Sequence, residues 1–230
     1  MKLKKIFILF MIFIFLMQSI VFADDEVEDD YVWENSEIEE ETNLNELNIL
    51  SKHCICIERT TSQVLYERDR YTRCAMASTT KILTAIIVIE NCELNEIVEI
   101  SKRAANTGGS TLGISTGQNL TVESLLYGLL LRSGNDTAVA LAEHVSGSVE
   151  DFSIIMNEKA KNLGLKNSNF VTPHGLDDDE HYTTAYDMAI LTNYALKNEV
   201  FRKIVNTKNI SLNIGGITRS LNNTNELLGN

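Results

Sequence analysis

Basic side chains are scarce in this sequence, and residues 24–51 lack them altogether. The 230 residues include 20 Lys and Arg against 32 Asp and Glu, which gives a formal net charge of −12. No stripe of Lys and Arg is present that could neutralise the phosphates of a nucleic acid. The composition therefore argues against nucleic acid as a partner.

A hydrophobic run long enough to cross a membrane comfortably is also missing. The apolar run near the N-terminus covers residues 6–17 behind three lysines, whereas a spanning helix needs about 20 apolar residues. Val21-Phe22-Ala23 follows, with the small or β-branched residues of a cleavage site. We expect residues 1–23 to be a signal peptide cleaved after Ala23, and the protein to be exported to the cell envelope or the extracellular space. An uncleaved membrane anchor is the alternative, since apolar residues resume at Ile20.

The segment after this leader is acidic. Residues 24–51 hold twelve Asp and Glu side chains and no Lys or Arg. Such a run repels itself and buries little apolar surface. We expect residues 24–50 to be a disordered acidic spacer and residues 51–230 to form the folded domain.

The cysteine content is low and leaves the redox state open. The four cysteines are Cys54, Cys56, Cys74 and Cys92. An even number in an exported chain permits disulfides without demonstrating them. A bridge between Cys54 and Cys56 would be strained, and their spacing is unusual for zinc. They can equally be small buried hydrophobes. We expect no metal and no cofactor.

The predicted elements run from strands to helices, and no internal repeat is visible. Residues 54–59 and 63–67 predict a hairpin that opens a sheet. Residues 78–91 predict a buried helix, and the Gly-, Ser- and Thr-rich residues 93–121 predict turns. Further helices are expected to begin at the capping residues Thr121, Ser148 and Thr184, with Gly134 interrupting the first. This order indicates a single α+β domain.

Ser78 and Lys81 are three residues apart at the start of this buried helix. Residues i and i+3 share one face of a helix, so the amine can reach the hydroxyl. A serine hydroxyl is a weak nucleophile and needs a base as it attacks. Burial lowers the pKa of a lysine and favours the neutral amine that can take the proton. The pair predicts a nucleophile with its own base.

Ser133-Gly134-Asn135 lies 55 residues after Ser78, at a break between two helical patterns. A turn there can direct two short polar side chains into a cleft. Ser-x-x-Lys followed by Ser-x-Asn forms two of the three motifs of the penicillin-recognising serine acyl-transferases. Longer matching stretches cover residues 77–85, 125–136, 172–176 and 182–189. From about Leu50 onward, the chain resembles the serine-type D-alanyl-D-alanine carboxypeptidases, which are low-molecular-mass penicillin-binding proteins of the bacterial cell envelope.

The resemblance implies both a fold and a chemistry. The fold would be α+β and β-lactamase/transpeptidase-like, an antiparallel sheet with a helical subdomain. Ser78 would be the acylated nucleophile, Lys81 its base and Ser133 a proton relay, while Asn135 would orient the substrate amide. The substrate would be a peptidoglycan stem pentapeptide that loses its terminal D-Ala to water. β-Lactams would acylate Ser78 by the same attack.

The third motif of this group, Lys-Thr-Gly, does not occur in the sequence. Thr107-Gly108 and Thr116-Gly117 both lack the preceding lysine. In the family this part carries the lysine for the substrate carboxylate, the second oxyanion donor and the closing strands of the sheet. The family's later C-terminal domain and amphipathic membrane-anchoring helix are also absent from the sequence. We therefore expect a C-terminally truncated, poorly stable and nearly inactive member, since losing one oxyanion donor typically costs about 100- to 1,000-fold in turnover.

Three other functions are weighed against this one. A class A β-lactamase shares Ser-x-x-Lys but has Asp where this chain has Gly134. It also needs a deacylating glutamate, and Glu180, which residues 168–182 offer, lies in a different context. A non-catalytic peptidoglycan-binding protein, or an inactive fragment, is the second. A Ser-His-Asp hydrolase is the third. Gly-x-Ser-x-Gly occurs at residues 113–117, but within the segment expected to form turns and not at a predicted strand-to-helix turn, where a nucleophile elbow lies. His144, His174 and His181 are expected to be polar surface or loop residues.

Overall fold

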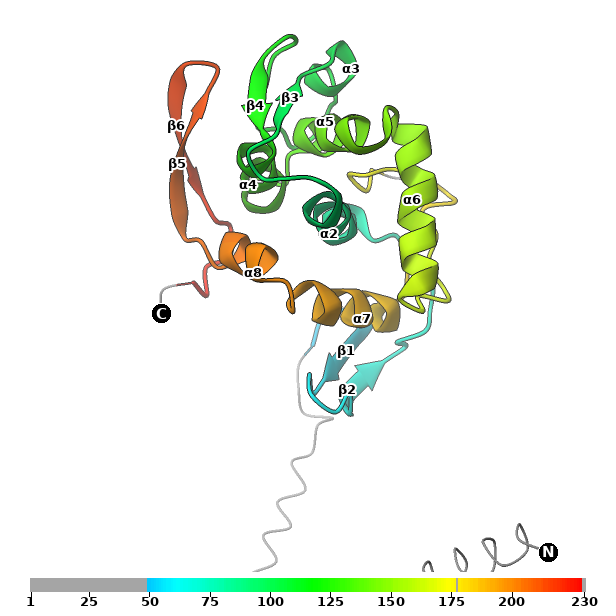
Figure 1. Ribbon diagram of the computed structural model, residues 1–230. Coiled ribbons are helices and arrows are strands. Elements are labelled where there is room, and N and C mark those ends of the chain that lie inside the picture. Colours follow the sequence, from blue (N-terminus) through cyan, green and yellow to red (C-terminus); the bar gives the residue numbers. More distant parts are fainter. Residues whose placement is uncertain (1–48, 177, 229–230) are drawn as a thin grey trace, which may run out of the picture. The chain divides into compact units, whose positions relative to one another are not determined.

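A computed structural model describes residues 49–176 and 178–228 of the chain (Figure 1). The predicted signal peptide lies outside these residues, as does all but the end of the predicted acidic spacer. Within the described part, no helix is both long and apolar enough to span a bilayer.

The first strands form the hairpin that the sequence predicts. β1 (Cys54–Ile57) pairs antiparallel with β2 (Val64–Arg68), and the register shifts between Cys56 and Ile57. Two further antiparallel pairs follow, β3 (Ile97–Glu99) with β4 (Asn119–Thr121), and β5 (Asn209–Ile214) with β6 (Ile217–Asn222).

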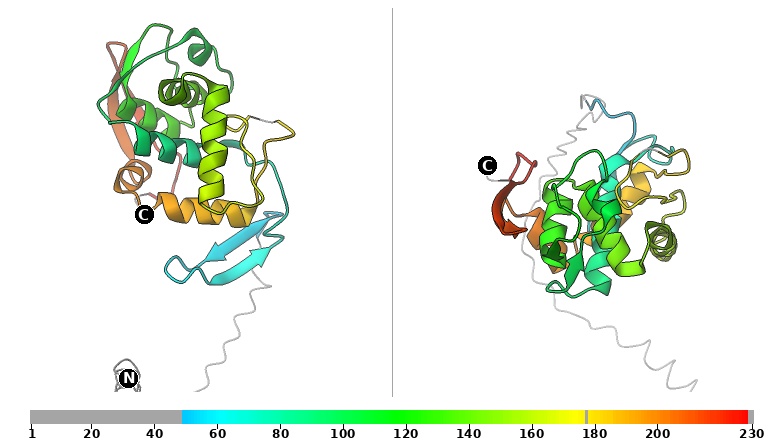
Figure 2. Two further views of the ribbon diagram at one scale, coloured as in Figure 1. Left: turned by 45° about the vertical axis from the view of Figure 1, so that its right-hand side comes forward. Right: turned by 90° about the horizontal axis from the view of Figure 1, so that it is seen from above.

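The strands are antiparallel as predicted, but they do not join into one sheet. Each pair in the described part of the chain is a separate two-stranded sheet. The β1–β2 hairpin lies against the helix α7 (Ala185–Ala195), whereas the β5–β6 hairpin lies near the helices α4 (Val122–Leu131) and α8 (Glu199–Val205) (Figures 1 and 2). Each strand is hydrogen-bonded to the strand next to it in the sequence. Among the described residues, no strand joins the β1–β2 hairpin to the β5–β6 hairpin.

A single buried helix organises the core. α2 (Lys81–Asn91) follows the short 3₁₀ helix η2 (Ala77–Thr80), so the helix predicted over residues 78–91 begins with a tighter turn. Side chains from Leu83 to Val88 are completely or almost completely buried. Five helices surround α2: α4 (Val122–Leu131), α5 (Asn135–Ser146), α6 (Val149–Asn162), α7 (Ala185–Ala195) and α8 (Glu199–Val205) (Figures 1 and 2). A one-turn helix, α3 (Lys102–Ala105), lies beside α5.

The predicted helix starts are confirmed by their capping bonds. The side chain of Thr121 accepts a hydrogen bond from the Ser124 N–H at the start of α4. Ser148 and Thr184 do the same for α6 and α7. These bonds satisfy N–H groups that have no partner within the helix. All four cysteines lie in the described part of the chain, and each is a free thiol.

Candidate active site

Ser78 and Lys81 meet as the helical spacing predicts. Ser78 lies in η2 and is exposed to solvent, while Lys81 is the first residue of α2. The Nζ atom of Lys81 lies 3.0 Å from the Oγ atom of Ser78. That separation is a hydrogen bond, within the range over which a base can take a proton.

The Lys81 side chain is buried, which is unusual for a lysine. The residue is only 2% exposed, and its Nζ donates a second hydrogen bond of 2.7 Å to the backbone carbonyl of His174. Burial lowers the pKa of Lys81 to about 8, because desolvation disfavours the charged form. Lys81 is therefore partly neutral near pH 8, where a lysine of ordinary pKa is almost wholly charged.

Ser133 is the third side chain of the site, beside Ser78 and Lys81. It lies between α4 and α5, and its Oγ donates a hydrogen bond of 2.8 Å to the Oγ of Ser78. The Ser78 oxygen therefore lies within hydrogen-bonding distance of both an amine and a second hydroxyl. A proton can move between these groups without crossing open solvent.

Two residues of the site adopt left-handed backbone conformations. Ala77, directly before the Ser78 nucleophile candidate, has φ 45°, and Ser133 has φ 55°. Non-glycine residues rarely adopt such angles, and they do so where the surrounding structure enforces them. Gly175 (φ 83°) faces this strained turn, and a Cβ atom there would overlap the carbonyl oxygen of Ala77. The loop that contains Gly175 therefore fits closely against the residue before Ser78.

Asn135 lies near the same break but is held by a different loop. Its backbone N–H donates to the Ser110 carbonyl over 2.7 Å, and its side-chain Nδ2 donates to the Gly108 carbonyl over 2.8 Å. The residue is buried, and Gly109 approaches its amide so closely that a Cβ atom would lie 2.6 Å from Nδ2. The Gly-rich segment expected to form turns therefore positions Asn135.

Asp136 is a positioning residue that the sequence reasoning missed. Its buried carboxylate accepts four backbone N–H bonds, from Leu112, Gly113, Ile114 and Thr137. These bonds fasten the loop of residues 108–114 to the start of α5. The signal available in the sequence was the acidic residue directly after Ser-Gly-Asn, at the first turn of a helix.

Two histidines expected at the surface or in loops, His174 and His181, hydrogen-bond to residues of the candidate site. His181 is buried, its Nδ1 accepts from the Val171 N–H over 2.9 Å, and its Nε2 lies 2.8 Å from the Thr80 Oγ1. His181 lies in a loop, one of the two positions expected for it, but it is buried there and its Nε2 reaches the 3₁₀ turn that contains Ser78. Burial lowers the pKa of His181, against the opposing charge of Asp178.

His174 lies in a loop as expected, half-buried beside Lys81. Burial and, secondarily, the positive charge of Lys81 lower the pKa of His174 to about 4, so the ring is neutral near pH 7. His174 contributes to the site through its backbone carbonyl, which accepts a hydrogen bond from the Lys81 amine.

A cavity of about 440 Å³ opens beside Ser78, Lys81 and Ser133. Its other walls are mainly apolar and include Leu129, Leu130 and Phe201. Ligand sites commonly combine an apolar lining with a few polar groups that fix orientation. Among the described residues, the group of three side chains close enough to share a metal ion lies elsewhere, at Cys92, Glu96 and His144.

Comparison with known proteins gives consistent matches. The profile of a family described as D-alanyl-D-alanine carboxypeptidase, peptidase family S11, matches residues 39–230. The D-alanyl-D-alanine carboxypeptidase DacF of Bacillus subtilis (strain 168) is 43% identical over 168 residues, which are 71% of this chain and 43% of DacF. The chain therefore spans less than half the length of DacF.

Solved structures agree with the profile. A mutant of the Streptomyces K15 DD-transpeptidase has a TM-score of 0.74 and 34% identity, covering 79% of this chain and 76% of that one. Penicillin binding protein 5 from Haemophilus influenzae has a TM-score of 0.72 and 32% identity, covering 78% of this chain and 54% of that one. These matches confirm the predicted α+β fold class and the resemblance drawn from the motifs. The chain belongs to the D-alanyl-D-alanine carboxypeptidase family.

Proposed function

We propose that Ser78 is the nucleophile of a D-alanyl-D-alanine carboxypeptidase reaction on peptidoglycan stem peptides. The observation that carries this proposal is the position of the Ser78 Oγ, which lies 3.0 Å from the Lys81 amine and 2.8 Å from the Ser133 hydroxyl. A nucleophile needs a base within hydrogen-bond reach, and the leaving amine needs a proton donor. Membership of the family supports the same assignment.

The proposed reaction proceeds in two stages. The Ser78 oxygen attacks the carbonyl of the penultimate D-Ala while neutral Lys81 takes the hydroxyl proton. The Ser78 N–H stabilises the oxyanion, and the proton passes through Ser133 to the leaving amine of the terminal D-Ala. A water molecule then attacks the resulting ester, releases the shortened peptide and restores the Ser78 hydroxyl. Asn135 orients the substrate amide in this scheme.

The same attack would open a β-lactam ring and leave an ester on Ser78. The name of the Haemophilus influenzae relative, penicillin binding protein 5, supports this extension. The sequence contains no Lys-Thr-Gly, so we assign no residue to the substrate carboxylate. Acylation of Ser78 is therefore the step that we propose for the residues of this chain.

Acylation is best detected as an accumulated covalent product. We would incubate the purified chain with a fluorescent penicillin for increasing times and follow the labelled band and the intact mass. We expect a mass increase of one penicillin, located on the peptide that contains Ser78. Ser78→Ala should abolish labelling, and Lys81→Met should reduce it strongly.

A matched control separates specific from incidental labelling. Ser115→Ala changes an exposed serine outside the site and should label like the parent chain. Label on another residue, or equal labelling of the Ser78→Ala variant, would reject Ser78 as the nucleophile. Binding of muropeptides without any adduct would instead favour the non-catalytic peptidoglycan-binding protein.

We also propose that the protein acts outside the cytoplasm. The three lysines, the apolar residues 6–17 and the small residue at Ala23 support export. Sequencing of the mature N-terminus tests this proposal, and Asp24 is the expected first residue. Recovery of the uncut chain in the cytoplasmic fraction would contradict it.

A further inference from the structure

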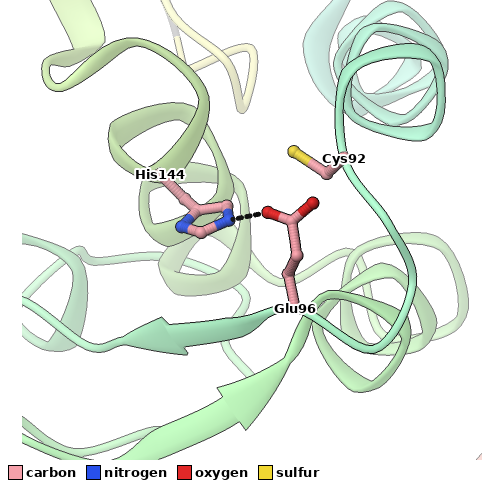
Figure 3. A group of neighbouring side chains, drawn as sticks. All are labelled: Cys92, Glu96 and His144. Atoms are coloured by element: carbon pink, nitrogen blue, oxygen red, sulfur yellow. Dashed lines mark hydrogen bonds and ion pairs between the residues drawn. The ribbon is translucent and has the colours of Figure 1, made fainter.

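A second group of reactive side chains lies outside the proposed active site. Cys92, Glu96 and His144 each present one ligand atom, and these three atoms lie within 4.8 Å of one another (Figure 3). Cys92 follows the last residue of α2, Glu96 precedes β3, and His144 lies in the last turn of α5. Glu96 and His144 are 48 positions apart in the sequence, so the fold brings this group together.

The geometry is close to that of a tetrahedral metal site. Zinc binds Cys, His and carboxylate ligands at about 2.0–2.3 Å, which places neighbouring ligand atoms about 3.5 Å apart. The His144 Nε2 and the Glu96 Oε2 are 2.9 Å apart and share a hydrogen bond, which a bound ion would replace. All three ligand atoms lie within 4.8 Å of one another, so an ion between them requires the side chains to rotate but not the backbone to rearrange.

The electrostatic surroundings favour a cation. Cys92 is the C-cap of the eleven-residue helix α2, and His144 lies near the end of the twelve-residue helix α5. Helix C-termini carry partial negative charge from unpaired carbonyl groups. Glu96 adds a carboxylate that accepts a hydrogen bond from the Glu93 N–H, and a bound metal would replace the proton of the Cys92 thiol.

One side of the group is open to solvent. The side chains of His144 and Glu96 are 23% and 41% exposed. A hollow of about 400 Å³ is lined by Cys92, Glu96 and Leu94 among others. An ion can therefore enter, and a water molecule can occupy a fourth position. Borderline-soft Zn²⁺ suits this mixed sulfur, nitrogen and oxygen set better than Mg²⁺ or Ca²⁺, which prefer oxygen alone.

We propose that one Zn²⁺ ion binds to Cys92, Glu96 and His144. The ion would link the end of α2 to the start of β3 and to α5. Lys81 begins α2, and an eleven-residue helix is about 16 Å long. The ion would therefore lie at the opposite end of α2 from Ser78. Its role would be to stabilise the domain, without contact with the reacting groups.

Metal titration of the chain tests the site directly. The purified chain would be treated with a chelator, desalted and titrated with zinc chloride against a competing colorimetric indicator. We expect one equivalent to bind and to raise the melting temperature, because binding to the folded state stabilises it. Cys92→Ser and His144→Gln should each weaken zinc binding by at least about tenfold.

Cys56→Ser is the matched control, because Cys56 is an exposed free thiol on β1. This variant should bind zinc like the parent chain. Cobalt reports the sulfur ligand, since a thiolate-to-cobalt charge-transfer band should appear in the parent and in Cys56→Ser and vanish in Cys92→Ser. Circular dichroism would verify that each variant is folded.

Two results would overturn the proposal. The first is the absence of saturable binding at one equivalent. The second is zinc affinity that survives Cys92→Ser but falls in Cys56→Ser, which would place the ion at the Cys-x-Cys pair.

Discussion

The backbone carbonyl of His174 accepts a hydrogen bond of 2.7 Å from the Nζ of Lys81, a residue 93 positions earlier in the chain. The two hydrogen bonds, to this carbonyl and to the Ser78 hydroxyl, hold the Lys81 amine in one position. Because the carbonyl belongs to the backbone, substitution of the His174 side chain would leave the bond in place. The position of the proposed base therefore depends on the path of the loop that carries His174.

The rate of acylation should rise with pH through the titration of Lys81. The base is active when neutral, and the pKa of Lys81 is lowered to about 8 by burial. The rate should therefore climb about tenfold per unit below pH 8 and level off above it. His174, with a pKa lowered to about 4, should add no step in this range. Penicillin labelling rates between about pH 6 and pH 10 provide the measurement, and a flat or falling profile would contradict the role of Lys81.

Ser133→Ala should separate catalysis from stability. The substitution removes the hydroxyl that contacts Ser78 but keeps a residue of similar size in the same left-handed conformation. We expect acylation to slow by about 100-fold or more, as is typical for loss of a proton-transfer group. The midpoint of urea unfolding should change little. Labelling at the parent rate would show that Ser133 takes no part in proton transfer.

Gly175→Ala should disrupt the turn that presents Ser78. The new Cβ would overlap the Ala77 carbonyl, and φ at this position is 83°. We expect a loss of about 2 kcal/mol or more in the free energy of unfolding and a large loss of labelling.

Gly164→Ala is the control for backbone strain alone. Its φ of 77° is similar, but no atom lies within 4 Å of the added Cβ. It should cost only about 1–2 kcal/mol and leave labelling intact. Equal effects of the two substitutions on labelling would mean that the contact with Ala77 is unimportant.

Asp136→Asn should loosen the loop that holds Asn135. An amide in place of the carboxylate directs an NH₂ group toward backbone N–H donors, which leaves some of the four bonds unmade. We expect a destabilisation of about 2–4 kcal/mol, since bonds to charged groups contribute about 1.5–3 kcal/mol each. Urea unfolding provides the measurement. The exposed Asp179→Asn should change stability by less than about 0.5 kcal/mol, and a similar value for Asp136→Asn would rule out this anchoring role.

Local patterns were enough to predict much of this fold and part of the site. The spacing of Ser78 and Lys81 depends only on helical periodicity, and the caps at Thr121 and Ser148 depend on bonds within one turn. The contacts of Asp136 and His181 could not be predicted in this way. They join segments whose approach is decided by packing of the whole domain, which no short window of sequence contains.

The division of the strands into three pairs was missed for the same reason. The β1–β2 and β5–β6 hairpins have short connections with local turn signals, whereas a long segment that includes α3 separates β3 from β4. Whether such pairs join into one sheet depends on distant segments.

The left-handed backbone conformations of Ala77 and Ser133 should affect how the protein loses activity on heating. Holding each residue in such a conformation costs about 1–3 kcal/mol, which the surrounding packing must offset. When that packing loosens, both turns can relax to ordinary angles while the helices remain intact, and the two hydroxyls then separate. Loss of penicillin labelling should therefore occur at a lower temperature than loss of helical circular dichroism, so the active site would fail before the fold does.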